Sequence, residues 1–274
     1  MKKLGVALSG GAARTIAHVG VLKALHDAKI PVSAVSGTSG GAVVAALYGA
    51  GLGVDDLIGM ALRLKWRDFA RFSINSLGLL STQPIRELME TRIGNIAFEQ
   101  MKIPCAVIAT DLTTFRAKVF RSGPVIPAVQ ASCSIPHVYK PMEWDGSIFT
   151  DGGVTNFLPV ECLPYLGADV TLGVSTMRGR PRGMRPKHMV HLMALFSRFV
   201  QYNNFVRSRE RADLLIQPSL YKFPVYRLHN ARALLEEGEK AARAVLPHLR
   251  RLLEGDPADT AFEETATATD PEHG

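Results

Sequence analysis

Residues 30–54 contain no Asp, Glu, Lys or Arg, and this run of 25 residues limits the folds open to the chain. Its length would suffice to cross a bilayer. Its centre, however, reads Ser-Gly-Thr-Ser-Gly-Gly over residues 36–41, which does not suit a membrane-spanning helix. The run is better explained by a buried strand over Pro31–Val35, a tight turn, and a helix over Gly41–Gly51 whose small residues let neighbouring elements approach closely. A buried strand–turn–helix unit of this kind predicts a layered α/β protein.

Strand and helix signals alternate along the rest of the chain. Short apolar runs predict strands at residues 4–8, 103–110, 117–121, 142–144, 147–150, 170–174 and 214–216. Apolar residues at helical spacing, or helix-forming segments between strands, predict helices over residues 15–29, 55–66, 82–93, 126–132 and 188–211. Strands that alternate with helices indicate an α/β fold with a mainly parallel central sheet.

Charge separates the chain into two parts. Seven of the 25 acidic residues follow residue 253, whereas all 32 Lys and Arg precede it. Residues 1–253 therefore combine 32 basic with 18 acidic residues, a net charge of +14. They are predicted to form one domain, and 254–274 an acidic, disordered tail. A basic domain can bind nucleic acid or approach an anionic membrane. No basic motif with interleaved aromatic residues and no helix-turn-helix pattern is evident, so a nucleic-acid partner is not expected.

Residues 37–41 read Gly-Thr-Ser-Gly-Gly and match the pattern GxSxG between a strand and a helix. In this context the serine of a tight turn projects its hydroxyl out of the sheet, and the glycines allow strained backbone and close approach of a substrate. The N-terminus of the helix favours negative charge that develops nearby. Ser39 is therefore a candidate nucleophile, although an ordinary glycine-rich turn would have the same appearance.

A second turn of this kind follows the first strand, as Ser-Gly-Gly-Ala-Ala-Arg over residues 9–14. Exposed N–H groups between a strand and a helix bind anions. Neither the G-x-G-x-x-G spacing of a dinucleotide site nor the Gly-Lys-Ser/Thr ending of a P-loop is present. An oxyanion hole requires only about two N–H groups aimed at the developing charge. This turn satisfies that requirement.

Asp151 is the third candidate. It follows the second strand of a hairpin turned by Asp145-Gly146, and it precedes Gly152 and Gly153. Glycines after an aspartate at a strand end let the carboxylate reach a site without crowding from neighbouring side chains. Taken alone, an Asp-Gly turn is common and indicates little about function.

The three motifs, in this order, resemble those of the patatin-like phospholipases. The resemblance covers about residues 3–250 and includes 109–112, 131–136, 156–160 and 212–216. It implies a three-layer α/β/α fold and a serine hydrolase of lipid acyl esters (phospholipids, lysophospholipids or acylglycerols). It also implies a Ser39–Asp151 dyad with an acyl-enzyme intermediate and no cofactor or metal. The oxyanion would be held by N–H groups of Gly10, Gly11 and Ala12. The residues that complete the three motifs are Arg14, Gly37, Gly40, Gly41, Gly152 and Gly153.

The sequence departs from the family pattern at two positions of the first turn. Ser9 stands where a glycine is usual, and Thr15 stands where a glycine usually follows the arginine. Ser9 can still present its backbone, but a β-branched Thr15 narrows the dihedral angles allowed where the turn enters the helix. A catalytically weak or inactive scaffold that binds acyl chains or a protein partner is therefore the alternative.

The histidines define the competing enzyme class. In an α/β-hydrolase a histidine follows the serine and the acid, so His229 or His248 could complete a triad. Only two strands precede the serine, however, and no local motif marks either histidine. His18 is expected to be packed or hydrogen-bonded rather than to act as a base. His188 and His191 lie three residues apart on a predicted helix, but no acid or cysteine near them in sequence completes a metal site.

Residues 178–211 are the candidate contact with an anionic membrane. Five basic residues over 178–187 precede a helix with both apolar and basic residues, which is typical of an interfacial helix. A core helix that covers the sheet, preceded by a flexible basic loop, explains the pattern equally well. Three cysteines without a CxxC pair predict buried, reduced thiols. The expected location is therefore cytoplasmic, with possible contact at the inner membrane surface, and the oligomeric state is left open.

Overall fold

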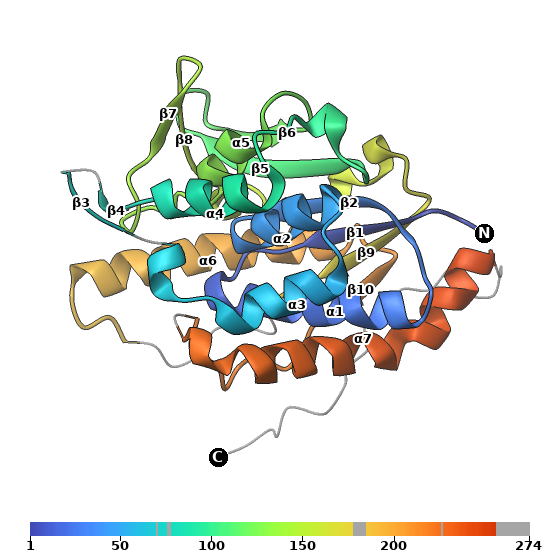
Figure 1. Cartoon of the computed structure of the whole chain (residues 1–274). Coiled ribbons are helices and arrows are strands. Elements are labelled where there is room, and N and C mark those ends of the chain that lie inside the picture. Colours follow the sequence, from blue (N-terminus) through green and yellow to red (C-terminus); the bar gives the residue numbers. More distant parts are fainter. Residues whose placement is uncertain (70, 76–77, 178–184, 226, 256–274) are drawn as a thin grey trace.

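A computed structural model describes residues 1–69, 71–75, 78–177, 185–225 and 227–255 (Figure 1). The strands are β1 (Leu4–Leu8), β2 (Val32–Thr38), β3 (Arg71–Asn75), β4 (Gly78–Ser81), β5 (Cys105–Asp111), β6 (Arg116–Phe120), β7 (Met142–Trp144), β8 (Ser147–Asp151), β9 (Val170–Val174) and β10 (Leu214–Ile216). The α-helices are α1 (Ile16–Asp27), α2 (Gly40–Gly49), α3 (Val54–Arg63), α4 (Gln83–Ile93), α5 (Val125–Ser132), α6 (Met189–Arg209) and α7 (Ala231–Glu254). Short 3-10 helices are η1 (Ala12–Thr15), η2 (Trp66–Asp68), η3 (Phe98–Gln100), η4 (Gly152–Val154), η5 (Val160–Cys162), η6 (Pro164–Leu166) and η7 (Leu228–Asn230).

The main sheet has eight strands in the order β10-β9-β1-β2-β5-β8-β7, with β6 also paired to β5. The strands from β10 to β5 are parallel to their neighbours. In contrast, β6 and β8 pair with β5 in the antiparallel sense, and so does β7 with β8. The mainly parallel central sheet expected from the sequence is confirmed.

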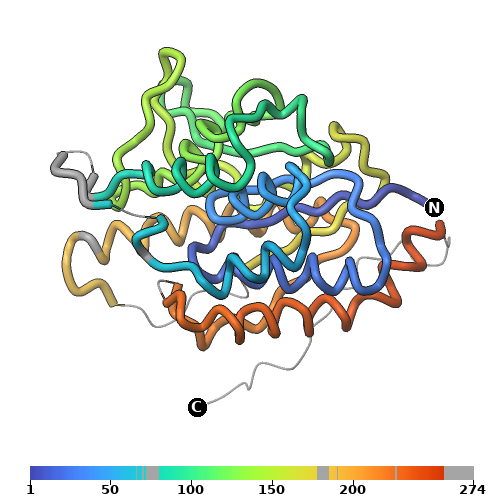
Figure 2. The backbone as a smooth tube through the Cα atoms, in the orientation of Figure 1, coloured from blue at the N-terminus to red at the C-terminus, as the bar shows by residue number. Residues whose placement is uncertain are grey.

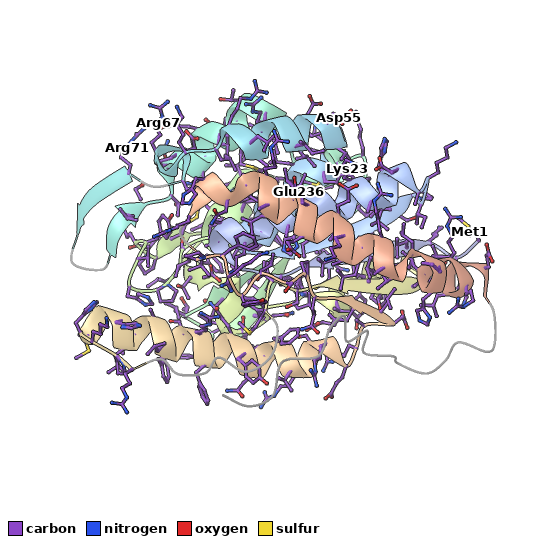
Figure 3. All side chains as sticks on the ribbon, turned by 90° about the horizontal axis from the view of Figure 1, so that it is seen from below. Met1, Lys23, Asp55, Arg67, Arg71 and Glu236 are labelled. Atoms are coloured by element: carbon purple, nitrogen blue, oxygen red, sulfur yellow. The ribbon has the colours of Figure 1, made fainter. Side chains whose placement is uncertain are left out.

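Alternate side chains of the strands enter two separate cores. Leu4, Val6 and Leu8 of β1 pack with buried residues of α1, α2, α3 and α7. Ala7 points the other way, into a smaller core that includes Phe157 and, from α6, Phe205. Figure 3 shows α6 on the opposite side of the molecule from α3 and α7. The sheet therefore lies between two helical layers, which confirms the three-layer α/β/α arrangement.

Helix α7 packs along α1, so the C-terminal helix lies beside the N-terminal one (Figure 2). The two helices approach closely because each has a glycine at the contact. A Cβ on Gly20 would collide with the carbonyl oxygen of Leu235, and one on Gly238 with that of Ala17. Helix α7 is not among the helices predicted from the sequence, although most of its residues favour a helix. Gly238 and Pro247 lower the intrinsic helix propensity of α7 at two positions, and packing on α1 adds to its stability.

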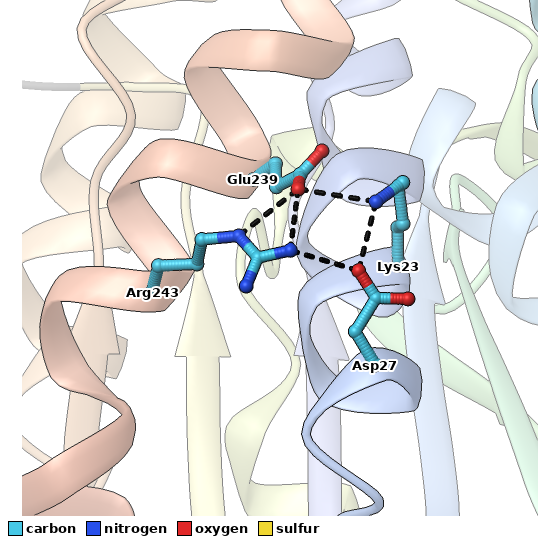
Figure 4. A network of polar contacts seen from close by, with 4 residues as sticks. All are labelled: Lys23, Asp27, Glu239 and Arg243. Carbon is cyan, nitrogen blue, oxygen red and sulfur yellow. Dashed lines mark hydrogen bonds and ion pairs between the residues drawn. The ribbon is translucent and has the colours of Figure 1, made fainter.

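Four charged side chains connect the outer edges of α1 and α7 (Figure 4). Lys23 Nζ lies 2.8 Å from Asp27 Oδ2 and 3.1 Å from Glu239 Oε1. Arg243 Nη2 lies 2.8 Å from the same oxygen of Asp27 and 2.7 Å from that of Glu239. Because these groups are substantially exposed and screened by salt, we expect the network to align the helices and to contribute little to stability.

The structure also bears on the uncharged run, the three cysteines and the two segments of unusual charge. The uncharged run 30–54 forms β2, the following turn and α2, and most of it is buried. Among the described residues, no helix combines the length and apolar character needed to cross a membrane. The three cysteines are free and buried, as expected. Most of the predicted tail 254–274, from residue 256 onward, lies outside the described residues, as does 178–184 of the basic segment.

Candidate active site

The sheet register brings the ends of three strands together. The parallel strands β1 and β2 end side by side at one edge. The pairing of β2 with β5 ends at Thr38 opposite Ile108, and Asp151 of β8 pairs with Ala109, the next residue of β5. Ser39 directly follows Thr38. The topology therefore places Ser39 and Asp151 at neighbouring positions, although 111 residues separate them in sequence.

Ser39 has the strained backbone of a nucleophile elbow, with φ of 55° and ψ of −128°. Such a conformation typically costs about 1–3 kcal/mol, and it persists only where the surroundings fix it. Here the Ser39 N–H donates to Ser132 Oγ at 2.8 Å, and the Ser39 carbonyl accepts from the N–H of Ala42 at 2.8 Å. Gly41 is required nearby, because a Cβ there would collide with carbonyl oxygens at the end of β1. The turn is therefore built to hold the serine in one orientation.

Asp151 is almost fully buried, with 1% of its surface exposed. Its N–H donates to the Ser134 carbonyl at 2.9 Å, and its own carbonyl accepts from Thr110 Oγ1 at 2.9 Å. Oδ1 accepts from the N–H of Gly153 at 2.8 Å. Oδ2 has no hydrogen-bond partner of full geometry among the described residues. The carboxylate is thus fixed by one oxygen, while the other is left available.

Burial raises the pKa of Asp151 to about 6, and hydrogen bonding by the Ser39 hydroxyl and the Gly153 N–H opposes part of that rise. The Ser39 hydroxyl therefore lies within reach of the carboxylate, although its contact lacks the full geometry of a hydrogen bond. A carboxylate with a pKa near 6 is ionised at neutral pH and still basic enough to accept a proton in a reaction. This environment suits a general base.

The turn after β1 has two residues with positive φ, Gly11 at 148° and Ala12 at 50°. Their N–H groups have no acceptor among the described residues. The N–H of Gly10, by contrast, donates to the Phe157 carbonyl at 3.2 Å. Successive free N–H groups in such a turn form an anion-binding concavity. The geometry therefore favours Gly11 and Ala12 as oxyanion donors, and it assigns Gly10 to holding the turn in place.

The carbonyl oxygen of Gly10 is held by two hydroxyls. Thr176 Oγ1 donates to it at 2.5 Å, and Ser9 Oγ at 2.9 Å. Ser9 Oγ also accepts from the N–H of Thr176 at 2.9 Å. Ser9 is completely buried. The side chain at this first departure from the family pattern thus links the turn to the chain after β9, a role that a glycine could not have.

Thr15, the second departure, is also accommodated. Its φ of −65° and ψ of −12° are ordinary helical values, so the dihedral strain considered from the sequence is not observed. Thr15 Oγ1 donates to the Ala12 carbonyl at 2.6 Å and closes the turn. The Thr15 side chain also lies against Gly40: a Cβ added to Gly40 would be 2.6 Å from Thr15 Oγ1. Thr15 therefore holds the turn against Gly40, the residue that follows Ser39.

An apolar cavity of about 260 Å³ lies beside Ser39. It extends between α1, α2 and α3, and its walls are almost entirely hydrophobic, as in many sites for apolar ligands. The lining includes Ile16, Val43, Val44, Leu57, Met60 and Tyr139. A cavity of this character, with a serine at its wall, can take up an acyl chain and present its ester to the hydroxyl.

Two partly buried arginines lie at the turn after β1, residues 9–14, here called the oxyanion turn after the role expected from the sequence. Arg14 Nε donates to the Phe223 carbonyl at 2.7 Å. Burial, together with the positive charge of Arg198, lowers the pKa of Arg14 to about 10. Burial also lowers the pKa of Arg198. Among the described residues, neither guanidinium has an acidic partner. The pair is therefore a concentration of uncompensated positive charge beside the site.

Arg198 reaches this position from the inner face of α6. One turn further along the helix, the side chain of Gln201 lies against Gly153. Asn204 Nδ2 donates to the Val154 carbonyl at 2.7 Å. Residues 198, 201 and 204 follow one another at helical spacing, so they share a face. This face of α6 covers the segment that follows Asp151.

Among the described residues, no histidine is hydrogen-bonded to Ser39. His18 is completely buried, and its Nε2 contacts the Ser9 carbonyl at 2.9 Å. Burial lowers the pKa of His18 to about 4, so the ring is neutral at pH 7 and Nε2 is the donor. The expectation of a hydrogen-bonded helix residue is confirmed. His229 is exposed on η7, and His248 contacts Arg251 on α7, which packs against α1 rather than against the elbow.

Three residues with a part in the site were not identified from the sequence as such. Ser132 lies in a motif that the family resemblance includes, but nothing local indicates that its hydroxyl would hold the Ser39 N–H. Thr176 and Arg198 reach the oxyanion turn from distant parts of the chain. The sequence does not show which side chain will donate to the Gly10 carbonyl, and a single arginine on α6 does not reveal which part of the chain it will face. Neither Thr176 nor Arg198 could therefore be found from local patterns.

Comparison with known proteins agrees with this geometry. Residues 6–163, which include all three motifs, match the family model for patatin-like phospholipases. Uncharacterised NTE family proteins of Mycobacterium tuberculosis and Mycobacterium bovis are 35% identical over 176 residues, which cover 63% of this chain and 49% of theirs. The lysophospholipase nte1 of Emericella nidulans is 32% identical over 179 residues, 63% of this chain and 12% of that protein.

The chain thus spans about half the length of its mycobacterial relatives and a small part of the fungal enzyme. Among solved structures, VipD from Legionella pneumophila aligns with a TM-score of 0.48 at 14% identity, over 90% of this chain and 67% of that one. The family model covers more than half of the sequence. The chain therefore belongs to the patatin-like phospholipase family.

Proposed function

We propose that this protein hydrolyses acyl esters of lipids with Ser39 as nucleophile and Asp151 as general base. The observation that carries the proposal is that Asp151 is buried beside Ser39 with its Oδ2 free of a hydrogen bond of full geometry. Burial raises the pKa of Asp151 to about 6, and Ser39 has a strained backbone and lies at the wall of an apolar cavity. Family membership and the lysophospholipase relatives support lipid hydrolysis in general.

The proposed reaction has two halves. Ser39 Oγ attacks the ester carbonyl while its proton passes to Asp151 Oδ2, and the N–H groups of Gly11 and Ala12 stabilise the oxyanion. Collapse of the tetrahedral intermediate breaks the ester bond, and Asp151 returns the proton to the leaving alcohol. Asp151 then accepts a proton from a water molecule that attacks the acyl-enzyme, and it returns that proton to Ser39 Oγ as the ester bond breaks and the fatty acid leaves. No histidine takes part.

The arginine pair supports a substrate with an anionic headgroup. Arg14 and Arg198 lie beside the oxyanion turn without an acidic partner in the described structure, and guanidinium groups bind phosphate oxygens well. A phospholipid or lysophospholipid would supply that phosphate, whereas an acylglycerol would not. We therefore place phosphate-bearing lipids ahead of neutral ones. An Arg198→Gln variant should lose activity on lysophosphatidylglycerol while it keeps activity on monoacylglycerol.

A fluorophosphonate probe separates catalysis from the alternative of an inactive scaffold that binds acyl chains. The wild-type protein should be labelled, and Ser39→Ala should not be. Asp151→Asn should lose hydrolysis of p-nitrophenyl esters, whereas Asp145→Asn, at an exposed hairpin turn, should keep it. A folded wild-type protein that neither reacts with the probe nor hydrolyses any ester in a chain-length series would overturn the proposal in favour of the scaffold.

A further inference from the structure

Helix α6 has an exposed apolar face along its N-terminal half. Its members, spaced three or four residues apart, are here called the α6 stripe. They are Met189, Leu192, Met193, Phe196 and Phe199, with 70%, 43%, 39%, 60% and 62% of their surfaces exposed. Contiguous apolar surface of this kind is unusual on a monomeric protein and marks an interaction site. The part of the chain that the structure describes leaves this face uncovered.

The other face of α6 is fixed on the protein. Phe205 is buried at 1% exposure in the smaller core, and Asn204 holds the Val154 carbonyl. The helix is thus anchored to the segment after Asp151, so the α6 stripe is not a core surface left open by an unpacked helix. The interpretation of this helix as a core helix that covers the sheet therefore applies to its packed face.

The chain that leads into α6 and forms it has basic residues and no acidic ones. The sequence has no Asp or Glu from residue 170 to residue 209, whereas the same range includes eight Lys and Arg. Arg185, Lys187 and His188 are exposed immediately before the first turn of α6. Apolar side chains flanked by cations, on a helix without acids, are the features that let a helix lie at the surface of an anionic bilayer.

The α6 stripe also lies at the end of the molecule where the site is. Figures 1 and 3 both place the N-terminal end of α6 and the β3–β4 hairpin at the same end, toward which β1 and β2 run. Phe69, just before β3, and Leu80 of β4 line the apolar cavity. A surface that contacts α6 at this end would therefore lie near the space proposed for an acyl chain.

We propose that the α6 stripe and the cations before it dock the protein on an anionic lipid bilayer. A second copy of the chain is disfavoured as the occupant, because two such faces would bring only positive charges together. The proposal concerns binding, goes beyond the proposed hydrolysis, and does not use either member of the dyad.

Co-sedimentation with vesicles tests it. The full chain should bind vesicles of phosphatidylcholine mixed with phosphatidylglycerol more tightly than vesicles of phosphatidylcholine alone, and added salt should weaken the difference. The double variant Phe196→Ser/Phe199→Ser should lose affinity at least about tenfold. Arg185→Glu/Lys187→Glu should remove the preference for phosphatidylglycerol. A matched control, Phe115→Ser/Tyr165→Ser, changes two other exposed aromatic residues, at 87% and 79% exposure, and should bind like the wild type.

The readouts separate docking from folding and from catalysis. Hydrolysis of soluble p-nitrophenyl butyrate by the α6 variants should match the wild type, which shows that they are folded. Ser39→Ala should bind vesicles normally. A wild-type protein that binds vesicles but hydrolyses no ester would refute the catalytic proposal alone. Docking is refuted if the wild type does not bind anionic vesicles, or if both double variants on α6 bind as it does. It is also refuted if light scattering shows that the α6 variants instead dissociate an oligomer of this chain.

Discussion

Replacing Asp151 with Asn should stabilise the fold at alkaline pH while it abolishes hydrolysis. Burial raises the pKa of this carboxyl from its ordinary value of 3.8 to about 6. A gap of about two units corresponds to about 3 kcal/mol by which the folded state disfavours the ionised carboxylate. The asparagine side chain removes that charge. Its amide oxygen can still accept from the Gly153 N–H, which lies 2.8 Å from Oδ1 in the native site.

The gain in the free energy of unfolding from Asp151→Asn should depend on pH. Since the folded pKa is raised, the folded state binds more protons than the unfolded state between about pH 4 and pH 6, and wild-type stability falls as pH rises through that window. The penalty is complete above the folded pKa and absent below the unfolded one. Asp151→Asn should therefore be more stable than the wild type by about 3 kcal/mol at pH 8, with no gain near pH 4. Urea unfolding at both pH values measures the difference, and Asp145→Asn serves as the exposed control.

The activity profile should report the same group. Hydrolysis of a soluble ester should rise with an apparent pKa of about 6 and stay constant above it, because only the ionised Asp151 accepts the Ser39 proton. The reasoning is refuted if Asp151→Asn shows no added stability at pH 8, or if the limb of the activity profile lies near pH 4. Either result would mean that the carboxylate is solvated rather than buried beside the serine.

Three further substitutions probe the oxyanion turn, the helix contact and the cavity. Thr176→Val removes the hydroxyl that donates to the Gly10 carbonyl at 2.5 Å, so steady-state kinetics should show kcat lowered roughly tenfold or more and KM for a soluble ester little changed. Gly238→Ala should cost about 2 kcal/mol or more in urea unfolding, because its Cβ would collide with a backbone carbonyl of α1. Its control, Gly59→Ala in α3, would meet only a flexible arginine tip at 3.1 Å and should gain up to about 1 kcal/mol. Val44→Phe fills part of the cavity, and a chain-length series of p-nitrophenyl esters should show a shift toward short acyl groups.

The parts of the site that the sequence predicts well are those encoded locally. A strand, a glycine-rich turn and a helix occupy consecutive residues, so the elbow around Ser39 is visible without knowledge of the rest of the fold. The same holds for the turn after β1 and for Asp151 after its hairpin. What the sequence does not show is the register of β5, which pairs with both β2 and β8 and brings the two catalytic candidates together. That adjacency came from the resemblance, not from spacing.

The missed elements depend on contacts between distant parts of the chain. The hairpin of β3 and β4 is short, forms a sheet of two strands, and has β-pairing with the rest of the chain only through a bridge from Leu80 to Tyr139 among the described residues, so its residues give a weak strand signal. Helix α7 contains a glycine and a proline that lower its intrinsic helix propensity, but that glycine is what allows its close contact with α1. A residue that weakens the isolated helix strengthens the packed one. Local propensity therefore gives the wrong sign at this position.

The same limit applies to the chemistry. An Asp-Gly-Gly sequence at an exposed turn would have a carboxyl with a pKa near 4, a poor base for a serine hydroxyl. The motif here lies where β8 joins the buried strand β5, and desolvation raises the pKa of Asp151 to about 6. Arg14 is likewise part of a recognisable motif. The second positive charge beside it comes from Arg198, which α6 brings from 184 residues away. Motifs therefore identify the residues that can react. The depth at which the fold buries Asp151 sets its pKa, and the charges beside the site are the basis for the proposed preference for phosphate-bearing lipids.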